Sequence, residues 1–439
     1  MTVFSGFRHL VHSTRIFLKV CVLCFLSVGA AHTVAADTKL LMPSYVLDVE
    51  KSKLVQGLAV AVNNGVIVAV DDAAVLKNRY GDAVLIDLAG ATLMPGLIDA
   101  HSHVLLHPYN ETSWTDQVLK ETWAERTLRA SNHLEATLMA GFTSLRDLGS
   151  EGAGYMDVGI RKALAKGVII GPRLIVAGKA IVATGTYGPK GFDPSHTINL
   201  GAEEADGADL ARVVRDQIGK GADIVKFYAD YRWGPNGEAR PTFSLAEMKL
   251  MVDTAASSGR PTVAHASTVE GMRRATLAGV QSIEHGDEGT LEIFKLMAKH
   301  GVIFCPTIAA GDAVSQYQGW KKGTEPEPVR ITAKRASMAR AIKAGVTICN
   351  GSDVGVFTHG DNARELEMLV DYGLSNAEAL KAATISSAVL MGKADNLGQV
   401  KVGYLADLIA VRGNPLEDLA TLRRIDFVMK AGEVYKTPH

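Results

Sequence analysis

The chain has 439 residues, of which 47% are hydrophobic and 21% are charged, and its formal net charge is −1. This length and composition supply enough apolar surface for a large domain with a smaller one beside it. The charged residues are spread along the chain without basic blocks, so the sequence argues against a nucleic-acid partner.

The first 36 residues have the pattern of a secretory signal peptide. Three basic residues precede an apolar run from Val20 to Ala31, and Val34-Ala35-Ala36 offers a cleavage site before Asp37. The run is too short to span a bilayer comfortably. We therefore expect a secreted or periplasmic protein with no stable membrane insertion after cleavage, a retained anchor being the alternative.

Two cysteines, Cys21 and Cys24, would leave with the signal peptide, and the mature chain would keep Cys305 and Cys349. Two cysteines are too few for a disulfide framework, and both fall in expected strands. The sequence favours two buried thiols, although neighbouring strands would permit a bridge.

The two ends of the mature chain carry short β-like runs. Residues 37–93 contain Gly57–Val62 and Gly65–Val70, and residues 393–439 contain Asp407–Val411 and Asp426–Met429. We expect these flanks to pair into one small discontinuous β-sheet domain around a central domain of residues 94–392.

The central region alternates short apolar runs with amphipathic stretches, a pattern typical of parallel strands joined by helices. The expected strands are Leu93–Val104, Phe142–Asp147, Arg173–Ala177, Asp223–Tyr228, Thr262–Ala266, Ser282–His285, Val302–Pro306 and Val346–Gly351. The expected helices are Trp123–Ala140, Asp209–Lys220, Ser244–Ser258, Thr268–Ala278, Leu291–His300, Ile331–Ala344 and Asn376–Leu390. Eight such strands favour an α/β fold of the (β/α)8 TIM barrel type over an open doubly wound sheet.

Metal-capable side chains follow several of these strands. Strand side chains alternate, so His101 and His103 lie on one face and can bind one metal. Lys226, His265, His285 and Asp353 end later apolar runs. Because the carboxyl ends of barrel strands open onto one face, we expect these groups to converge. Core histidines satisfied by packing are the alternative, and Lys226 alone is typical of a strand-end lysine that reaches solvent.

Five segments together resemble the binuclear branch of the amidohydrolase superfamily, from about Leu40 to the C-terminus. They are Met94–His103, Ile224-Val225-Lys226, Val263-Ala264-His265-Ala266, Ile283-Glu284-His285-Gly286 and Gly351-Ser352-Asp353. The resemblance implies two divalent metal ions, typically Zn²⁺, bridged by a carbamylated Lys226. It assigns one ion to His101, His103 and Asp353, and the other to His265 and His285. Relatives often form homo-oligomers, which we also expect here.

Two ions in such a site would provide a metal-bridged hydroxide as the nucleophile and polarise a carbonyl group. Asp353 would carry the proton from this nucleophile to the leaving nitrogen. The expected reaction is hydrolysis of an amide or an ester.

The loops Gly185–Phe192 and Tyr228–Gly234 resemble those of Xaa-Arg and Xaa-Lys dipeptidases and of ochratoxin-degrading amidohydrolases. We therefore expect cleavage before the C-terminal amino acid of dipeptides or N-acyl amino acids, including ochratoxin A. A cyclic-amide hydrolase or deaminase on the same fold, and a non-catalytic metal-binding barrel, are the alternatives.

Tyr231 is expected to donate a hydrogen bond to the developing oxyanion, and packing over the barrel rim is its alternative role. Substrate contacts are expected from Tyr187, Tyr228, Arg232 and His359, and for Arg232 a solvated loop arginine is the alternative. Near His359, helix capping by Asp361 or Asn362 is the alternative interpretation.

Overall fold

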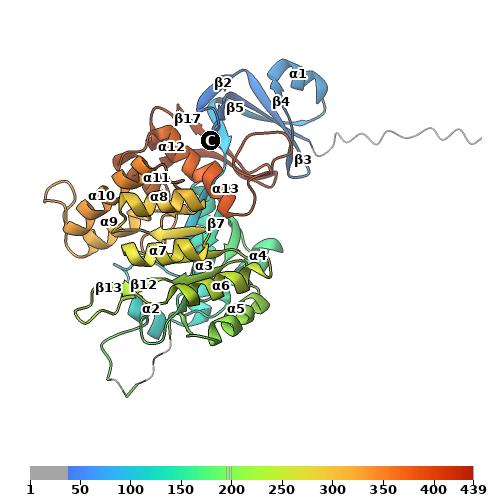
Figure 1. Ribbon diagram of the computed structural model, residues 1–439. Helices are drawn as coiled ribbons and strands as arrows, with labels where there is room; N and C mark the ends of the chain where they lie inside the picture. Colours follow the sequence, from blue (N-terminus) through green and yellow to red (C-terminus); the bar gives the residue numbers. More distant parts are fainter. Residues whose placement is uncertain (1–37, 194, 197, 199, 439) are drawn as a thin grey trace, which may run out of the picture. The chain divides into compact units, whose positions relative to one another are not determined.

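The computed structural model describes residues 38–193, 195–196, 198 and 200–438 (Figure 1). The expected signal peptide, with Cys21 and Cys24, lies outside these residues. No helix in the described part of the chain is both long enough and apolar enough to cross a membrane.

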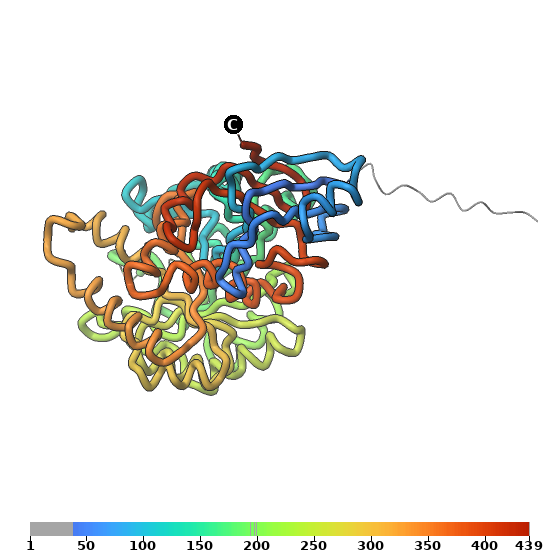
Figure 2. The backbone as a smooth tube through the Cα atoms, turned by 90° about the horizontal axis from the view of Figure 1, so that it is seen from above, coloured from blue at the N-terminus to red at the C-terminus, as the bar shows by residue number. Residues whose placement is uncertain are grey.

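Both ends of the described chain build one eight-stranded sheet, and Figures 1 and 2 show its blue N-terminal and red C-terminal strands side by side. Along the sheet the order is β19-β18-β17-β5-β1-β3-β4, with β2 paired to β1. The strands are β1 (Lys39–Asp48), β2 (Lys53–Gln56), β3 (Leu58–Asn63), β4 (Val66–Asp72), β5 (Val84–Pro95), β17 (Leu408–Arg412), β18 (Ile425–Lys430) and β19 (Glu433–Lys436). Helix α1 (Ala73–Arg79) follows β4.

The junction between the two ends is the antiparallel pair β5–β17, in which Met94 lies opposite Ile409. Apolar side chains such as Leu41, Val60 and Phe427 are fully buried beside it. The chain then turns at Gly96 into the barrel, so β5 leads directly into the first barrel strand.

The barrel is formed by parallel strands, and the expected TIM-barrel fold with a sheet from both termini is confirmed. Its strands are β6 (Leu97–Ser102), β7 (Phe142–Asp147), β8 (Arg173–Val176), β11 (Val225–Tyr228), β14 (Thr262–Ala266), β15 (Ser282–His285) and β16 (Ile303–Cys305). Two short strands, β9 (Ile181–Val182) and β10 (Glu203–Glu204), extend the sheet beside β11.

The eighth barrel position differs from the expected strand Val346–Gly351. Only isolated parallel bridges occur there, from Ile348 to Phe304 and from Val354 to Ser102. The backbone N–H of Ser352 donates to the carboxylate of Asp99 at 2.9 Å, and Asp353 has a left-handed φ of 60°. These interactions replace a regular strand ladder and still close the barrel.

Helices cover the outside of the barrel, and α5, α6, α7, α8 and α10 pack in sequence against their neighbours (Figure 1). Side chains such as Thr268 and Thr290 cap their N-termini, and Gly279 and Gly301 end α7 and α8 in the left-handed conformation. The helices close to the expected ranges are α3 (Trp123–Met139), α5 (Asp209–Lys220), α6 (Leu245–Ala256), α7 (Val269–Ala278), α8 (Leu291–His300) and α10 (Val329–Ala344).

Other elements depart from the sequence expectations. The expected helix Asn376–Leu390 consists of α12 (Asn376–Lys381), a π-helical segment η1 (Ala382–Ser386) and α13 (Ser387–Leu390). The additional elements are α2 (Trp114–Lys120), α4 (Met156–Ala165), α9 (Ile308–Tyr317), α11 (Ala363–Asp371), the 3-10 segment η2 (Leu419–Arg423) and the hairpin of β12 (Asp230–Arg232) with β13 (Ala239–Pro241).

Cys305 and Cys349 form a disulfide, with their Cα atoms 5.0 Å apart. The expectation of two free buried thiols is therefore wrong. The parallel bridge between Phe304 and Ile348 sets the following residues side by side, and both cysteines are fully buried.

Candidate active site

A cavity of about 600 Å³ opens at the carboxyl ends of the barrel strands. Figure 1 shows β12, β13 and α9 on this side of the barrel, at the left of the view. The cavity collects all the expected site residues except His359: His101, His103, Tyr187, Lys226, Tyr228, Tyr231, Arg232, His265, His285 and Asp353. Residues up to 252 positions apart in sequence therefore share one wall, as the strand-end pattern predicts.

The first cluster in this cavity consists of His101, His103 and Asp353, whose potential ligand atoms all lie within 4.8 Å of one another. The Oδ1 atom of Asp353 is 3.6 Å from Nε2 of His101 and 3.4 Å from Nε2 of His103. On the other side of each ring, Nδ1 faces an acceptor: Glu284 Oε2 at 2.8 Å from His101 and the Gly149 carbonyl at 2.9 Å from His103. Nδ1–H donation to these acceptors leaves the Nε2 lone pairs facing Asp353.

The second pair, His265 and His285, lies beside the first cluster. Their ring centroids are 4.3 Å apart, and His285 is 5.2 Å from His101 by the same measure. Nδ1 of His285 is 2.7 Å from the Thr307 hydroxyl. The ring of Tyr228 stacks on His265 at 4.4 Å, with 14° between the planes. Hydrogen bonding and stacking thus orient these rings.

Burial controls the charge of the site. It lowers the pKa of His101 well below its ordinary value and that of His265 to about 3, with the charge of Lys226 as the second cause in both. Burial also lowers the pKa of Lys226 to about 8 and raises that of Asp353 to about 6. Neutral imidazoles are the form that binds metal ions.

A layer of buried polar residues supports the first cluster, and the sequence analysis missed it. Arg146 and Glu284 are both fully buried and paired at 3.0 Å, and the Ser282 hydroxyl donates to Glu284 at 2.6 Å. Asp99 accepts from the Ser352 hydroxyl and, at 2.7 Å, from the Asn362 amide. Charged residues inside otherwise apolar runs were the available signal for Arg146, Glu284 and Asp99.

Four residues other than glycine around the cavity have left-handed backbones: Glu151 (φ 47°), His285 (φ 75°), Thr307 (φ 51°) and Asp353 (φ 60°). Such conformations cost about 1–3 kcal/mol each and persist only where their surroundings hold them. Their concentration at one cavity is typical of a functional site.

His359 is placed differently from the sequence expectation. It lies outside the residues that line the cavity, its Nε2 is 3.0 Å from the Leu106 carbonyl, and its ring stacks on His133 at 4.2 Å. These contacts bury the ring, so the geometry does not support substrate binding by His359. Instead, Tyr109, Glu151 and Arg330 line the cavity, and sequence reasoning assigned none of them.

The donor set of His101, His103 and Asp353 fits a divalent metal ion. Nitrogen and carboxylate ligands of this kind suit Zn²⁺, and each Nδ1–acceptor contact behind His101, His103 and His285 matches the usual support of a metal-ligating imidazole. An ammonium at Lys226 has no lone pair to offer, so this residue cannot bind a metal ion in its charged form.

The chain is similar in sequence to known hydrolases. The amidohydrolase family model matches residues 92–435. Ochratoxinase from Aspergillus niger is 29% identical over 410 residues, which cover 87% of this chain and 83% of that protein.

The fold is also similar to those of solved peptidase structures. A Xaa-Pro dipeptidase with methionine bound in its active site superposes with a TM-score of 0.81 at 30% identity, covering 91% of this chain and all of that one. A prolidase complexed with N-methylphosphonate-L-proline superposes with a TM-score of 0.77 at 30% identity, again over 91% and 100% of the two chains.

Proposed function

The chain belongs to the amidohydrolase family and is a hydrolase of amide-type carbon–nitrogen bonds, and we propose that it cleaves the bond before a C-terminal amino acid in dipeptides or N-acyl amino acids. One observation carries the proposal. His101, His103 and Asp353 converge with His265, His285 and Lys226 in a single cavity.

We propose that this cavity holds two divalent ions, of which Zn²⁺ is the typical choice. His101, His103 and Asp353 would hold one ion and His265 and His285 the other, with carbamylated Lys226 between them. When bound, such ions supply a hydroxide near neutral pH and polarise the scissile carbonyl group. The lowered pKa of Lys226, about 8, supports carbamylation because part of the amine is then neutral and able to react with carbon dioxide.

Asp353 is the proposed proton carrier. It is close to both histidines of its cluster, and without metal ions burial raises its pKa to about 6. A carboxylate in this position can accept a proton from the nucleophile and deliver it to the leaving nitrogen. Glu284 would keep His101 in the required tautomer through its contact with Nδ1.

Tyr231 is the proposed oxyanion donor. Its hydroxyl forms no hydrogen bond with a described residue, and burial raises its pKa, so the proton remains available for donation. Its ring lies 4.9 Å from that of Tyr187 and 5.7 Å from that of Tyr228. Arg232 follows directly and is the proposed partner of the substrate carboxylate.

The size of the cavity and the related structures support an amino acid as the leaving group. A volume of about 600 Å³ accommodates a dipeptide or a small N-acyl amino acid. One relative was solved with methionine in its active site and another with a phosphonate derivative of proline. The similarity to ochratoxinase adds ochratoxin A to the substrates to be tested.

The test is a screen of zinc-loaded protein against dipeptides, N-acyl amino acids and ochratoxin A, with release of the free amino acid measured by chromatography. For the best substrate, amidation of the C-terminal carboxylate should lower kcat/KM about a hundredfold, because a charged hydrogen bond of about 3 kcal/mol is lost. Equal cleavage of free and amidated substrates would contradict the proposal and favour a cyclic-amide hydrolase.

Tyr231→Phe provides a second test of the same site. Turnover should fall more than substrate affinity, because the phenol donates to the oxyanion only as it forms. Tyr45→Phe is the matched control, since Tyr45 is an exposed residue of the terminal sheet. Equal effects of the two substitutions would remove Tyr231 from the mechanism.

We further propose that the protein is secreted or periplasmic and forms a homo-oligomer. The support for export is the signal-like sequence before Asp37. N-terminal sequencing of the protein from its native source should find a start near Asp37, and light scattering should give a mass of more than one chain.

A further inference from the structure

Glu151 is a buried acidic residue of the cavity that neither the proposed ligand set nor the proposed mechanism uses. It is 2% exposed and has a left-handed φ of 47°. Buried Arg126 holds this conformation by donating to the main-chain carbonyls of Leu105, Ser150 and Glu151. A strained backbone that is held this firmly indicates that the position of the side chain matters.

The carboxylate of Glu151 accepts hydrogen bonds from two aromatic residues through one oxygen. The Trp114 indole N–H lies 2.9 Å and the Tyr187 hydroxyl 2.6 Å from Oε2. The other oxygen, Oε1, is buried without a hydrogen-bond partner in the described chain and lies 4.0 Å from Nδ1 of His103, which already faces the Gly149 carbonyl. No lysine or arginine of the described chain forms an ion pair with this carboxylate within 4 Å. The charge of Glu151 is balanced only at longer range, by buried Arg126, and the carboxylate itself has no directly paired cation among the described residues.

Tyr187 connects Glu151 to the cavity, because it lines the cavity and its hydroxyl donates a hydrogen bond to the Glu151 carboxylate. Its only proton is donated to Glu151, so the phenol oxygen, which the Tyr228 side chain also contacts, can act only as an acceptor. Its ring centroid lies 4.7 Å from that of Tyr228 and 4.9 Å from that of Tyr231. Aromatic faces, an acceptor oxygen and a buried anion behind them are the features that attract an organic cation.

The same cavity offers groups for the opposite charge. Arg232 and Arg330 line it, and neither forms an ion pair with a carboxylate of the described chain within 4 Å. A dipeptide with free ends carries one positive and one negative group, whereas an N-acyl amino acid carries only the negative group. The charges of the cavity match the dipeptide.

We propose that Glu151, acting through Tyr187, binds a cationic group of the substrate, so that the enzyme prefers dipeptides with a free α-ammonium group over N-acyl amino acids. This inference rests on the proposed amide-cleaving function and identifies its substrate class. Glu151 is thus a specificity-determining residue rather than a ligand or a proton carrier.

The test compares alanyl-phenylalanine with N-propionyl-phenylalanine, which differs only by replacement of the ammonium group with hydrogen. The metal-loaded wild type should show a kcat/KM ratio of about ten or more in favour of the dipeptide. Glu151→Gln, which preserves shape and an acceptor oxygen, should reduce this ratio about tenfold, as should Tyr187→Phe. A second pair, N-propionyl-arginine and N-propionyl-norleucine, shows whether a side-chain cation uses the same subsite.

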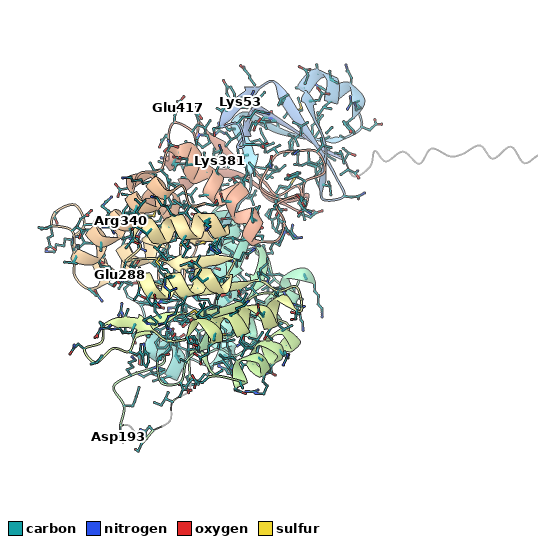
Figure 3. The ribbon with its side chains drawn as sticks, viewed as in Figure 1. Lys53, Asp193, Glu288, Arg340, Lys381 and Glu417 are labelled. Atoms are coloured by element: carbon teal, nitrogen blue, oxygen red, sulfur yellow. A yellow bond between two sulfur atoms is a disulfide. The ribbon has the colours of Figure 1, made fainter. Side chains whose placement is uncertain are left out.

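Glu288→Gln is the matched control, because Glu288 lines the cavity but is exposed and has no side-chain hydrogen bond with a described residue (Figure 3). For Glu288→Gln, the ratio of kcat/KM between the dipeptide and the N-propionyl compound should stay within about threefold of the wild-type ratio. Equal loss of activity of Glu151→Gln toward both compounds would assign Glu151 a purely structural role and overturn the inference.

A binding measurement separates this inference from the proposed function. Calorimetry on metal-loaded Asp353→Asn should give weaker binding of alanyl-phenylalanine, but not of N-propionyl-phenylalanine, when Glu151→Gln is added. If neither compound is cleaved or bound by the parent proteins, the proposed function fails. If both are cleaved and the ratio is the same with and without Glu151, only the present inference fails.

Discussion

The carboxyl-end face of the barrel and the sheet of the two termini both contain buried side chains, but these side chains differ in polarity. The sheet encloses apolar side chains such as Leu41, Val60 and Phe427 in regular strands. The barrel face encloses the charged residues Arg146 and Glu284, and residues with left-handed backbones such as His285 and Asp353 lie beside them. Apolar burial stabilises a fold, whereas burial of charge costs free energy unless each charge is paired. The barrel face is therefore organised for chemistry, and the terminal sheet contributes stability.

The largest expected effect that separates the two regions is on turnover. Asp353→Asn removes the proposed proton carrier and a carboxylate ligand, so kcat should fall by at least about 10³-fold, while the unfolding temperature changes little. Steady-state kinetics and calorimetric melting measure the two quantities. Asp216→Asn, on the surface of α5, is the control. Turnover that survives in Asp353→Asn would contradict the assigned role.

The reverse effect is expected in the terminal sheet. Phe427→Ala removes a fully buried aromatic ring and should lower the free energy of unfolding by about 3–5 kcal/mol, with kcat per folded molecule unchanged. Urea unfolding measures the loss. Val84→Ala, at an exposed position of β5, should cost less than about 0.5 kcal/mol. A large loss of kcat in folded Phe427→Ala would show that the two regions are coupled.

The same difference explains what the sequence could predict. Apolar runs and the alternation of His101 and His103 located the strand ends, because these signals are local. The position of His359 was not predictable, because the loop after Asp353 folds back toward a distant segment. The Nε2 atom of His359 thereby contacts the Leu106 carbonyl. The start of α9 also lacked a local signal. Its first N–H groups donate to the carboxylate of Glu365, which is 57 residues away from Ile308.

Glu365 makes this long-range cap testable through pH. Burial raises its pKa from 4.5 to about 8, although the N–H groups of Ile308 and Ala309 favour the charged form. Between these values the folded chain keeps a proton that the unfolded chain releases. The contribution of protonated Glu365 to the free energy of unfolding is therefore complete below about pH 4.5 and is lost as pH rises toward 8.

Glu365→Gln cannot titrate, so the difference in unfolding free energy between wild type and variant should shrink as pH rises from 5 to 8. The expected slope is at most about 1.4 kcal/mol per pH unit, measured by urea unfolding at constant metal concentration. Glu378→Gln is the control, because the pKa of Glu378 is lowered and its contribution stays constant over this range. A constant difference for Glu365→Gln would show that the carboxylate is already charged in the folded protein.

The smallest effect is expected behind the second histidine pair. The Thr307 hydroxyl lies 2.7 Å from Nδ1 of His285 and helps to fix which ring nitrogen faces the cavity. Thr307→Val keeps the shape and removes this contact, so metal affinity should fall by about 10–100-fold, as is typical for loss of an outer partner of a ligating histidine. Competition with a chelator of known affinity measures the change. Thr276→Val is matched to it, since Thr276 is also buried but its hydroxyl donates within α7 to Met272. Equal metal affinity in the two variants would mean that the barrel backbone alone orients His285, and that the irregular face needs less support than its left-handed residues indicate.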